Sequence, residues 1–250
     1  RDHREAWPEG YRGYRQDNNL TIAEALRAAG YHTAMTGKWH MGKAYTPVDC
    51  GFDDFYGFLN GAMTYWNPER YVRLPETAPR REYARGEFYA TDVITDYAID
   101  FAARARELHK PLFLHVAYNA PHFPLQAPRE RIDHYMEIYL KGWDAIRKER
   151  EARLRRLGLL SDEEQAAGRG VVPASQFIDR TRPVPAWEEL PEEQRHDLAR
   201  RMAIYAAMID IMDRNIGRLV EALRDNGQLE NTLLLFLSDN GACAEWHEFG

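Results

Sequence analysis

Three short polar groups combine residue types that could act together on an anionic substrate. Asp239 and Asn240 come directly after the apolar run NTLLLFLS, Lys38 and His40 follow a second apolar stretch, and His122 follows a third. Carboxylate and amide oxygens are ligands for hard cations such as calcium. A lysine supplies a fixed positive charge for an oxyanion, and a histidine can move a proton near neutral pH.

Each of these groups also has an ordinary structural explanation. Asp-Asn-Gly is a common turn sequence, a Lys-x-His pair is commonplace, and His122 could be a loop histidine that bonds the backbone. Two oxygen side chains also fall short of the roughly 6 to 8 ligands that calcium takes, so a metal site here needs further ligands. The chemistry therefore depends on whether the fold brings the groups together.

The elements that precede these groups are helices followed by strands. The first unit predicts a helix with a capping box between Thr21 and Glu24 and a stop at Gly30, followed by a strand from Tyr31 to Met35.

The second and third units follow the same order without sequence similarity. Apolar residues recur at helical spacing from Val93 to Leu108, before the strand LFLHVAY at 112–118, which we expect to be buried on both faces. A third helix at 201–227 leads into the run at 232–238, which we expect to be a buried strand.

This alternation predicts an α/β fold with a mostly parallel sheet and helices on both faces. Ligands of such sheets bind outside the carboxyl ends of the strands. We therefore expect Lys38, His40, His122, Asp239 and Asn240 to converge in a cleft on the order of 10 Å across.

Composition excludes several other classes of protein. The formal charge of -6 argues against a general nucleic-acid binder, and the apolar runs are too short for a membrane span. The basic stretch from Arg147 to Gly158 is interpreted as a solvated helix face whose glutamates form local ion pairs. Cys50 and Cys243 are interpreted as unpaired thiols.

A long polar segment separates the second and third units. We interpret residues 126–195 as an insertion over the surface, with one helix from about Tyr139 to Gly158 and then a proline-rich loop at 171–191.

Four separated motifs together resemble the sulfatases of the arylsulfatase type, in the alkaline phosphatase superfamily. They are TIAEALRAAGYHTAMTGKWHMG, GFDDFYGFLNGAMTYW, PLFLHVAYNAPHFPLQAP and NTLLLFLSDNGACAEW, in the order of the family, and the resemblance runs along nearly the whole chain. The resemblance implies an alkaline-phosphatase-like core, of which residues 1–250 would be the central part of one catalytic domain, incomplete at both ends.

The activity that this resemblance implies is hydrolysis of a sulfate ester, of a small molecule or a carbohydrate, by a formylglycine beside a calcium ion. By motif match, Lys38 would contact the sulfate, His40 would hold and activate the formylglycine, and His122 would protonate or orient the leaving oxygen. Asp239 and Asn240 would be calcium ligands. A periplasmic or secreted location is expected from the resemblance, whereas the oligomeric state and the particular ester are not indicated.

The sequence departs from the family pattern at the nucleophile. No Cys-x-Pro-x-Arg motif, from which formylglycine is made, and no paired aspartates before it occur in the 250 residues. We therefore expect a fragment that is inactive alone.

Two alternatives to a sulfatase stay open. One is a phosphonate or phosphodiester hydrolase of the same superfamily, although Asn240 favours calcium over the zinc of Asp-His relatives. The other is a non-catalytic binding protein that keeps the fold and has lost its nucleophile. The sequence upstream in the parent gene would distinguish it from an enzyme.

Overall fold

The computed structural model describes residues 19–42, 45–161 and 185–241. The chain divides into two compact units, the first made of Arg1–Ala127 with Met208–Leu233 and the second of Pro128–Ala207 with Leu234–Gly250. Cys243 and residues 171–184 of the proline-rich loop lie outside the described residues.

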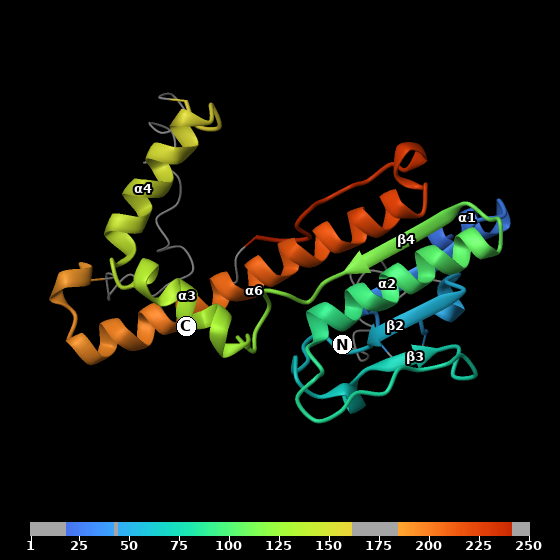
Figure 1. Ribbon diagram of the computed structural model, residues 1–250, viewed down its shortest axis with the longest axis horizontal. Coiled ribbons are helices and arrows are strands. Elements are labelled where there is room, and N and C mark those ends of the chain that lie inside the picture. Colours follow the sequence, from blue (N-terminus) through green and yellow to red (C-terminus); the bar gives the residue numbers. More distant parts are fainter. Residues whose placement is uncertain (1–18, 43–44, 162–184, 242–250) are drawn as a thin grey trace, which may run out of the picture. The chain divides into compact units, whose positions relative to one another are not determined.

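The first unit is built on a mixed sheet with the strand order β3-β2-β1-β4 (Figure 1). Strand β1 pairs in parallel with β2 and with β4, and β3 pairs antiparallel with β2. The elements in chain order are α1 (Ile22–Ala28), β1 (His32–Lys38), β2 (Asp54–Phe58), β3 (Val72–Leu74), α2 (Ala90–Glu107) and β4 (Leu112–Ala117). The expected α/β fold with a mostly parallel sheet is confirmed, although β2 and β3 were not among the predicted strands.

Local sequence signals set the start of the first helix as expected. The amide of Glu24 donates to Oγ1 of Thr21 at 3.0 Å, and the amide of Thr21 donates to Oε2 of Glu24 at 2.9 Å. This capping box satisfies two amides that a helix start would otherwise leave without partners.

Two expectations about strands were wrong. Strand β4 is not buried on both faces: it lies at the edge of the described sheet, its apolar side chains are half-buried and His115 is exposed. Residues 232–238 form no strand among the described residues, and Leu233, Leu235 and Leu237 are at least 72% exposed. An apolar run predicts burial, but a strand also needs a neighbour with free backbone groups, which local sequence does not reveal.

The second unit is helical where it is described. It contains α3 (Arg129–Tyr139), α4 (Trp143–Arg156) and the first part of α6 (Glu192–Asp225), which continues into the first unit. Its core joins Trp187, Leu190, Leu198 and Ala199, against which Met136, Tyr139 and Trp143 pack. The predicted helix at 139–158 is confirmed as α4, whereas α3 was not predicted. None of the described helices is long and apolar enough to cross a membrane.

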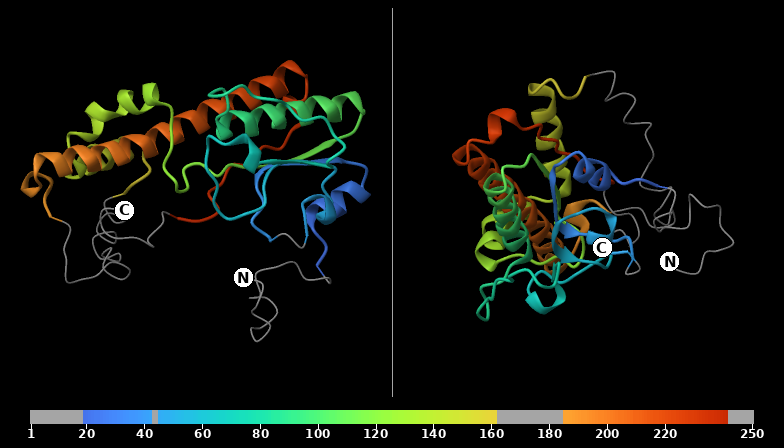
Figure 2. Two further views of the ribbon diagram at one scale, coloured as in Figure 1. Left: turned by 90° about the horizontal axis from the view of Figure 1, so that it is seen from below. Right: turned by 90° about the vertical axis from the view of Figure 1, so that its right-hand side faces the viewer.

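Helices lie on both faces of the sheet in the first unit (Figure 2). Helix α2 packs against β1, β2 and β4, with the Tyr56 and Tyr97 rings stacked at 3.8 Å between centroids. On the other face, Ala23 of α1 joins a cluster with Met35, Phe52 and Phe55. Helices therefore pack against both faces of the sheet, and the ends of its strands are not covered by this packing.

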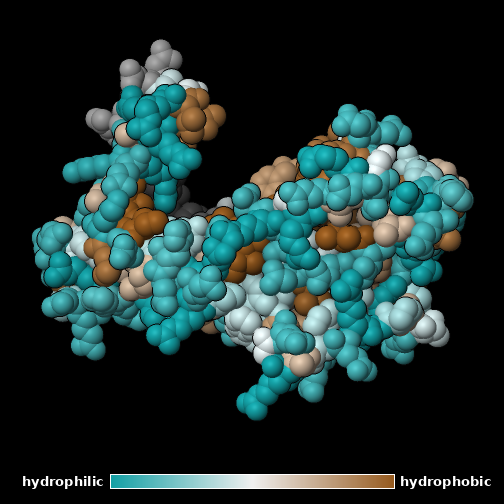
Figure 3. Space-filling view, viewed as in Figure 1, coloured by the Kyte–Doolittle hydropathy of each residue, from teal (hydrophilic) through white to brown (hydrophobic). Residues whose placement is uncertain are grey.

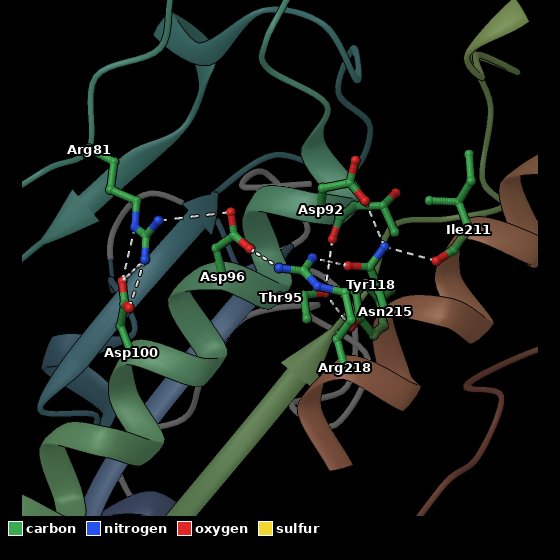
Figure 4. A network of polar contacts seen from close by, with 10 residues as sticks. Arg81, Asp92, Thr95, Asp96, Asp100, Tyr118, Ile211, Asn215 and Arg218 are labelled. Carbon is green, nitrogen blue, oxygen red and sulfur yellow. Dashed lines mark hydrogen bonds and ion pairs between the residues drawn. The ribbon is translucent and has the colours of Figure 1, made fainter. Parts of the chain in front are cut away.

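A polar network joins α2 to the C-terminal half of α6 (Figure 4). The side chain of Asn215, 2% exposed, donates to Asp92 at 2.7 Å and accepts from Arg218 at 2.7 Å. Burial raises the pKa of Asp92, while the hydrogen bond from Asn215 and the charge of Arg218 oppose this rise. Beside it, the hydroxyls of Thr95 and Tyr118 lie 2.6 Å apart. The network thus fixes the residue that directly follows β4.

Charged residues form a compensated cluster at the amino ends of β1 and β2. Asp54, 2% exposed, lies 3.2 Å from Nε2 of His32 and 3.3 Å from Nε of Arg104, and it also pairs with buried Arg73. Burial by itself would raise the pKa of Asp54, but hydrogen bonds from His32 and Arg73 and the charges of Arg73 and Arg104 outweigh it, so the pKa lies below the ordinary 3.8. The carboxylate therefore stays charged inside the protein.

Replacing this carboxylate should remove a pH-dependent part of the stability. Because the folded-state pKa of Asp54 is lowered, its contribution is present above about pH 4 and is lost as pH falls through the folded-state pKa. We expect Asp54→Asn to lower the free energy of unfolding at pH 7 by about 3 kcal/mol, because it leaves Arg73 buried without a counter-charge. The difference from wild type should shrink below pH 4.

Urea denaturation between pH 2 and pH 7 measures this effect. Asp100→Asn is the matched control, because Asp100 is 44% exposed where it pairs with Arg81 and such pairs contribute about 1 kcal/mol or less. Equal losses in the two variants at pH 7 would contradict the assignment.

Candidate active site

The first part of the candidate site is the carboxyl end of β1. Trp39 is anchored there, since its amide donates to the carbonyl of Phe58 at 3.0 Å and its indole Nε1 donates to that of Tyr45 at 2.8 Å. The half-buried Lys38 and His40 lie on either side of this anchor. In the described part of the chain the Lys38 amino group has no acidic partner within 4.0 Å, so its charge is available to an anion.

His40 has an unusual backbone conformation, and its ring lies directly beside a glycine. Its φ is 55°, in the left-handed region that few non-glycine residues adopt. A Cβ atom added at Gly61 would lie 2.4 Å from Nε2 of the His40 ring, which is too close for any real contact. Gly61 therefore makes the space in which the imidazole lies.

The second part of the site is the turn that follows β4. The amide of His122 donates to the carbonyl of Asn119 at 2.7 Å, and Nδ1 of His122 lies 2.7 Å from the carbonyl oxygen of Phe123. The backbone contact of this exposed ring is the ordinary one for a loop histidine. Because Nδ1 makes this contact, Nε2 is the ring nitrogen that can exchange a proton or a hydrogen bond with another group.

Residues 64–65 and Gln126 hold this turn in place. The Tyr65 hydroxyl donates to the carbonyl of His122 at 3.0 Å, and Oε1 of Gln126 accepts from the amide of Tyr65 at 2.9 Å and from the Thr64 hydroxyl at 3.1 Å. Burial raises the pKa of Tyr65 well above its ordinary value, so the hydroxyl remains a donor at physiological pH. Sequence reasoning did not identify Tyr65 or Gln126, because they lie 57 and 61 positions from their partners.

Asn119 is a further polar residue at this strand end that the sequence did not single out. It is 5% exposed, and neither its side-chain oxygen nor its nitrogen makes a hydrogen bond of standard geometry with a described residue. Its amide lies near the hydroxyl of Tyr71, whose pKa is raised by burial and partly lowered by Asn119. Buried amides with unmet hydrogen bonds are uncommon, so Asn119 is a further polar residue to consider at this strand end.

The pairing of β1 with β4 brings the two parts to one edge of the sheet. The strands are parallel and in register, with Gly37 opposite Ala117. Lys38 is the last residue of β1, and His40 and His122 follow the carboxyl ends of β1 and β4. Gly37 has a φ of 99°, and a Cβ atom there would lie 1.9 Å from the carbonyl oxygen of Ala117. Only glycine allows the two strands to approach this closely at their ends.

Asp239 and Asn240 lie in an exposed local turn. The Ser238 hydroxyl donates to the carbonyl of Asn240 at 2.6 Å, and Nδ2 of Asn240 donates to the carbonyl of Gly241 at 2.7 Å. Both residues belong to the second unit, and no strand carries them to the sheet. Their convergence with Lys38, His40 and His122 therefore stays a prediction.

The donor atoms of Asp239 and Asn240 suit a hard cation in type but not in number. Both supply oxygen, which calcium prefers, and neither supplies the sulfur or imidazole typical of zinc. Among the described residues no group of three or more His, Cys, Asp or Glu side chains is placed to hold a metal ion. A calcium site would need ligands in addition to these two.

Comparison with known proteins identifies the family. The fold is that of an α/β protein with a largely parallel sheet, and the candidate residues lie at the carboxyl ends of two of its strands. A model of the Sulfatase family matches residues 3–247, and the chain belongs to that family.

The curated relatives are longer sulfatases. The chain is 34% identical over 247 residues to an uncharacterised sulfatase of Schizosaccharomyces pombe, covering 93% of this chain and 43% of that protein. It is 36% identical over 243 residues to an arylsulfatase of Klebsiella aerogenes, covering 94% of this chain and 50% of that protein. The chain thus spans about half the length of these relatives.

Solved structures support the same fold. The crystal structure of Ps i-CgsB in complex with k-i-k-neocarrahexaose matches with a TM-score of 0.51 and 24% identity, over 84% of this chain and 37% of that chain. The Bacteroides fragilis yidJ structure matches with a TM-score of 0.52 and 21% identity, over 87% and 43% of the two chains. At these identities the likeness shows the fold alone.

The role of Gly61 can be tested without catalysis. We expect Gly61→Ala to displace the His40 ring, because the added methyl would lie 2.4 Å from Nε2. The His40 imidazole resonances in nitrogen-proton correlation spectra should shift, and the free energy of unfolding should fall by about 1–3 kcal/mol.

Gly217→Ala in α6 serves as the control, because a Cβ atom there meets nothing within 4 Å. It should leave the His40 resonances in place and stabilise the helix by roughly 0.5–1 kcal/mol. Unchanged His40 resonances in the Gly61 variant would show that the glycine does not position the ring.

Proposed function

We propose that the protein to which this chain belongs hydrolyses sulfate esters, with Lys38, His40 and His122 as catalytic residues. The proposal rests on the register of β1 with β4. A lysine with no acidic partner in the described part of the chain and two histidines lie at or just beyond the carboxyl ends of these two strands. Membership in the Sulfatase family supports the reaction class. The arylsulfatase of Klebsiella aerogenes supports the arylsulfatase type.

The three residues would divide the work by their chemistry. Lys38 would bind the negatively charged sulfate oxygens, since its ammonium group is half-buried and has no acidic partner in the described part of the chain. His122 would give a proton to the leaving oxygen through Nε2, while its Nδ1 contact with the Phe123 carbonyl sets the ring orientation. His40 would contact the nucleophile, in a position that Gly61 permits.

Two groups implied by the family would complete the reaction. A formylglycine would supply the nucleophile, and a calcium ion held in part by Asp239 and Asn240 would neutralise negative charge on the sulfate. The Cys-x-Pro-x-Arg motif is absent from the 250 residues. Among the described residues, no group of three or more His, Cys, Asp or Glu side chains is placed to hold a metal ion. We therefore propose that the 250-residue chain is inactive by itself.

An assay of both forms tests this proposal. The complete parent protein should release para-nitrophenol from para-nitrophenyl sulfate, and Lys38→Ala should reduce kcat/KM strongly because the sulfate loses its cation. The purified 250-residue chain should show no release above its own Lys38→Ala variant. Turnover of bis(para-nitrophenyl) phosphate in preference to the sulfate would instead favour a phosphodiesterase, and no turnover of either ester would favour a binding protein.

The leaving-group dependence tests the role of His122. In the parent protein we expect His122→Ala to lower kcat by roughly 10²–10⁴ for alkyl or sugar sulfates, whose leaving oxygens need a proton. The loss should be much smaller for para-nitrophenyl sulfate, because its phenolate leaves readily. His134→Ala, a change of an exposed histidine on α3, is the control. Equal losses for both kinds of substrate would remove the general-acid role.

A further inference from the structure

Helix α4 carries more positive charge than its packing explains. Over Trp143–Arg156 it has six basic and three acidic side chains. None of its residues is buried (Figure 3). Its basic residues are Arg147, Lys148, Arg150, Arg153, Arg155 and Arg156. A helix that is polar on all sides normally depends on many ion pairs between successive turns.

Ion pairs within α4 account for few of these charges. Arg155 pairs with Glu151 at 3.5 Å, and Glu149 is paired with Lys141, which lies before the helix, at 3.2 Å. The other five basic side chains are exposed and have no acidic partner among the residues that the structure describes. The expectation of a helix face neutralised by its own glutamates is therefore only partly met.

Four of the arginines form a regular row. Arg147, Arg150, Arg153 and Arg156 are spaced three residues apart, so each lies about 4.5 Å further along the helix axis than the last, and the row winds about half a turn. Side chains at this spacing are neighbours, and like charges there repel one another. The row costs the free helix some stability, and a bound polyanion would remove that cost.

Contacts of α4 fix its start and leave the arginine row accessible. The rings of Trp143 and Trp187 lie 4.9 Å apart, and Oδ2 of Asp144 accepts from the amide of Trp187 at 3.1 Å. These contacts belong to the first turn. Among the residues that the structure describes, the side chains of Arg147, Arg153 and Arg156 have no hydrogen-bond, ion-pair or ring partner, and Arg150 interacts only with the Tyr139 side chain.

We propose that the arginine row of α4 is a binding surface for a linear sulfated carbohydrate chain. Guanidinium groups form paired hydrogen bonds with sulfate oxygens as they do with phosphate and carboxylate, and a chain with sulfates on successive sugars contacts several of them at once. The choice of a sulfated partner rests on the proposed function. Nucleic acid is the other polyanion that such a row could fit, and the test below includes it as a competitor.

Binding of heparin oligosaccharides to the purified chain tests this surface. Isothermal titration calorimetry at several salt concentrations should show binding to the sulfated oligosaccharide, and much weaker binding to its desulfated form. The variant R147Q/R150Q/R153Q/R156Q should lose affinity about tenfold or more, with a shallower dependence of log K on log salt concentration.

A second set of substitutions controls for net charge. R129Q/R195Q/R201Q/R214Q removes the same charge from arginines that each have a carboxylate within 4.0 Å, and it should change affinity little. Lysine at the four α4 positions should restore most of the binding, because it keeps the charge. Circular dichroism establishes that each variant remains folded.

The outcomes separate this surface from the proposed activity. Equal loss in both glutamine variants, or no binding by wild type, would overturn the proposal, as would equal affinity for double-stranded DNA of matched charge. In the parent protein the α4 variant should hydrolyse para-nitrophenyl sulfate at the wild-type rate. A parent without sulfatase activity would refute the proposed function while the binding result would still stand.

Discussion

The parallel pairing of β1 with β4 is the constraint on which the candidate site depends. Residues 38–40 and 119–122 are about 80 positions apart, and only a shared sheet edge brings them into one neighbourhood. The pairing reaches the very end of both strands because Gly37 has no side chain to strike the carbonyl of Ala117. A larger residue at position 37 would separate the strand ends, and with them the lysine from the second histidine.

The two ends of the sheet differ in how their charged and polar residues are paired. At the amino ends, Asp54 is surrounded by His32, Arg73 and Arg104, so nearly every charge there is compensated inside the protein. At the carboxyl edge, Lys38 has no acidic partner in the described part of the chain, and Asn119 keeps unmet hydrogen-bonding capacity. Burying a polar group without a partner costs free energy, so the second arrangement is less favourable than the first unless another group supplies the missing hydrogen bonds.

Local signals in the sequence were sufficient for the helices other than α3 and for two strands of the sheet. The capping box at Thr21 and the apolar spacing from Val93 were read correctly because each acts within a few residues. They were insufficient where stability comes from a distant partner. The segment DFYGF forms β2 because it pairs with β1. The run at 232–238 is equally apolar, but it pairs with no strand among the described residues and so forms none.

The same distinction applies to the site. Lys38, His40 and His122 were identifiable because each follows an apolar run, and parallel strands end at one edge. Gly61, Tyr65, Asn119 and Gln126 were not, because their importance lies in contacts with residues far along the chain. A glycine that makes space for an imidazole has no signature in its own neighbourhood. The three-dimensional contact is the only evidence for it.

The solvent exposure of each cationic side chain determines how strongly it can interact with an anion. The arginines of α4 are in water, where each interaction with an anion is weak and screened by salt, so useful affinity requires several of them acting on one chain. Lys38 is half-buried at the sheet edge, where the lower local dielectric makes a single charge far more effective. A row of exposed arginines is therefore suited to holding a polymer, and a single half-buried lysine to stabilising charge on one sulfate group.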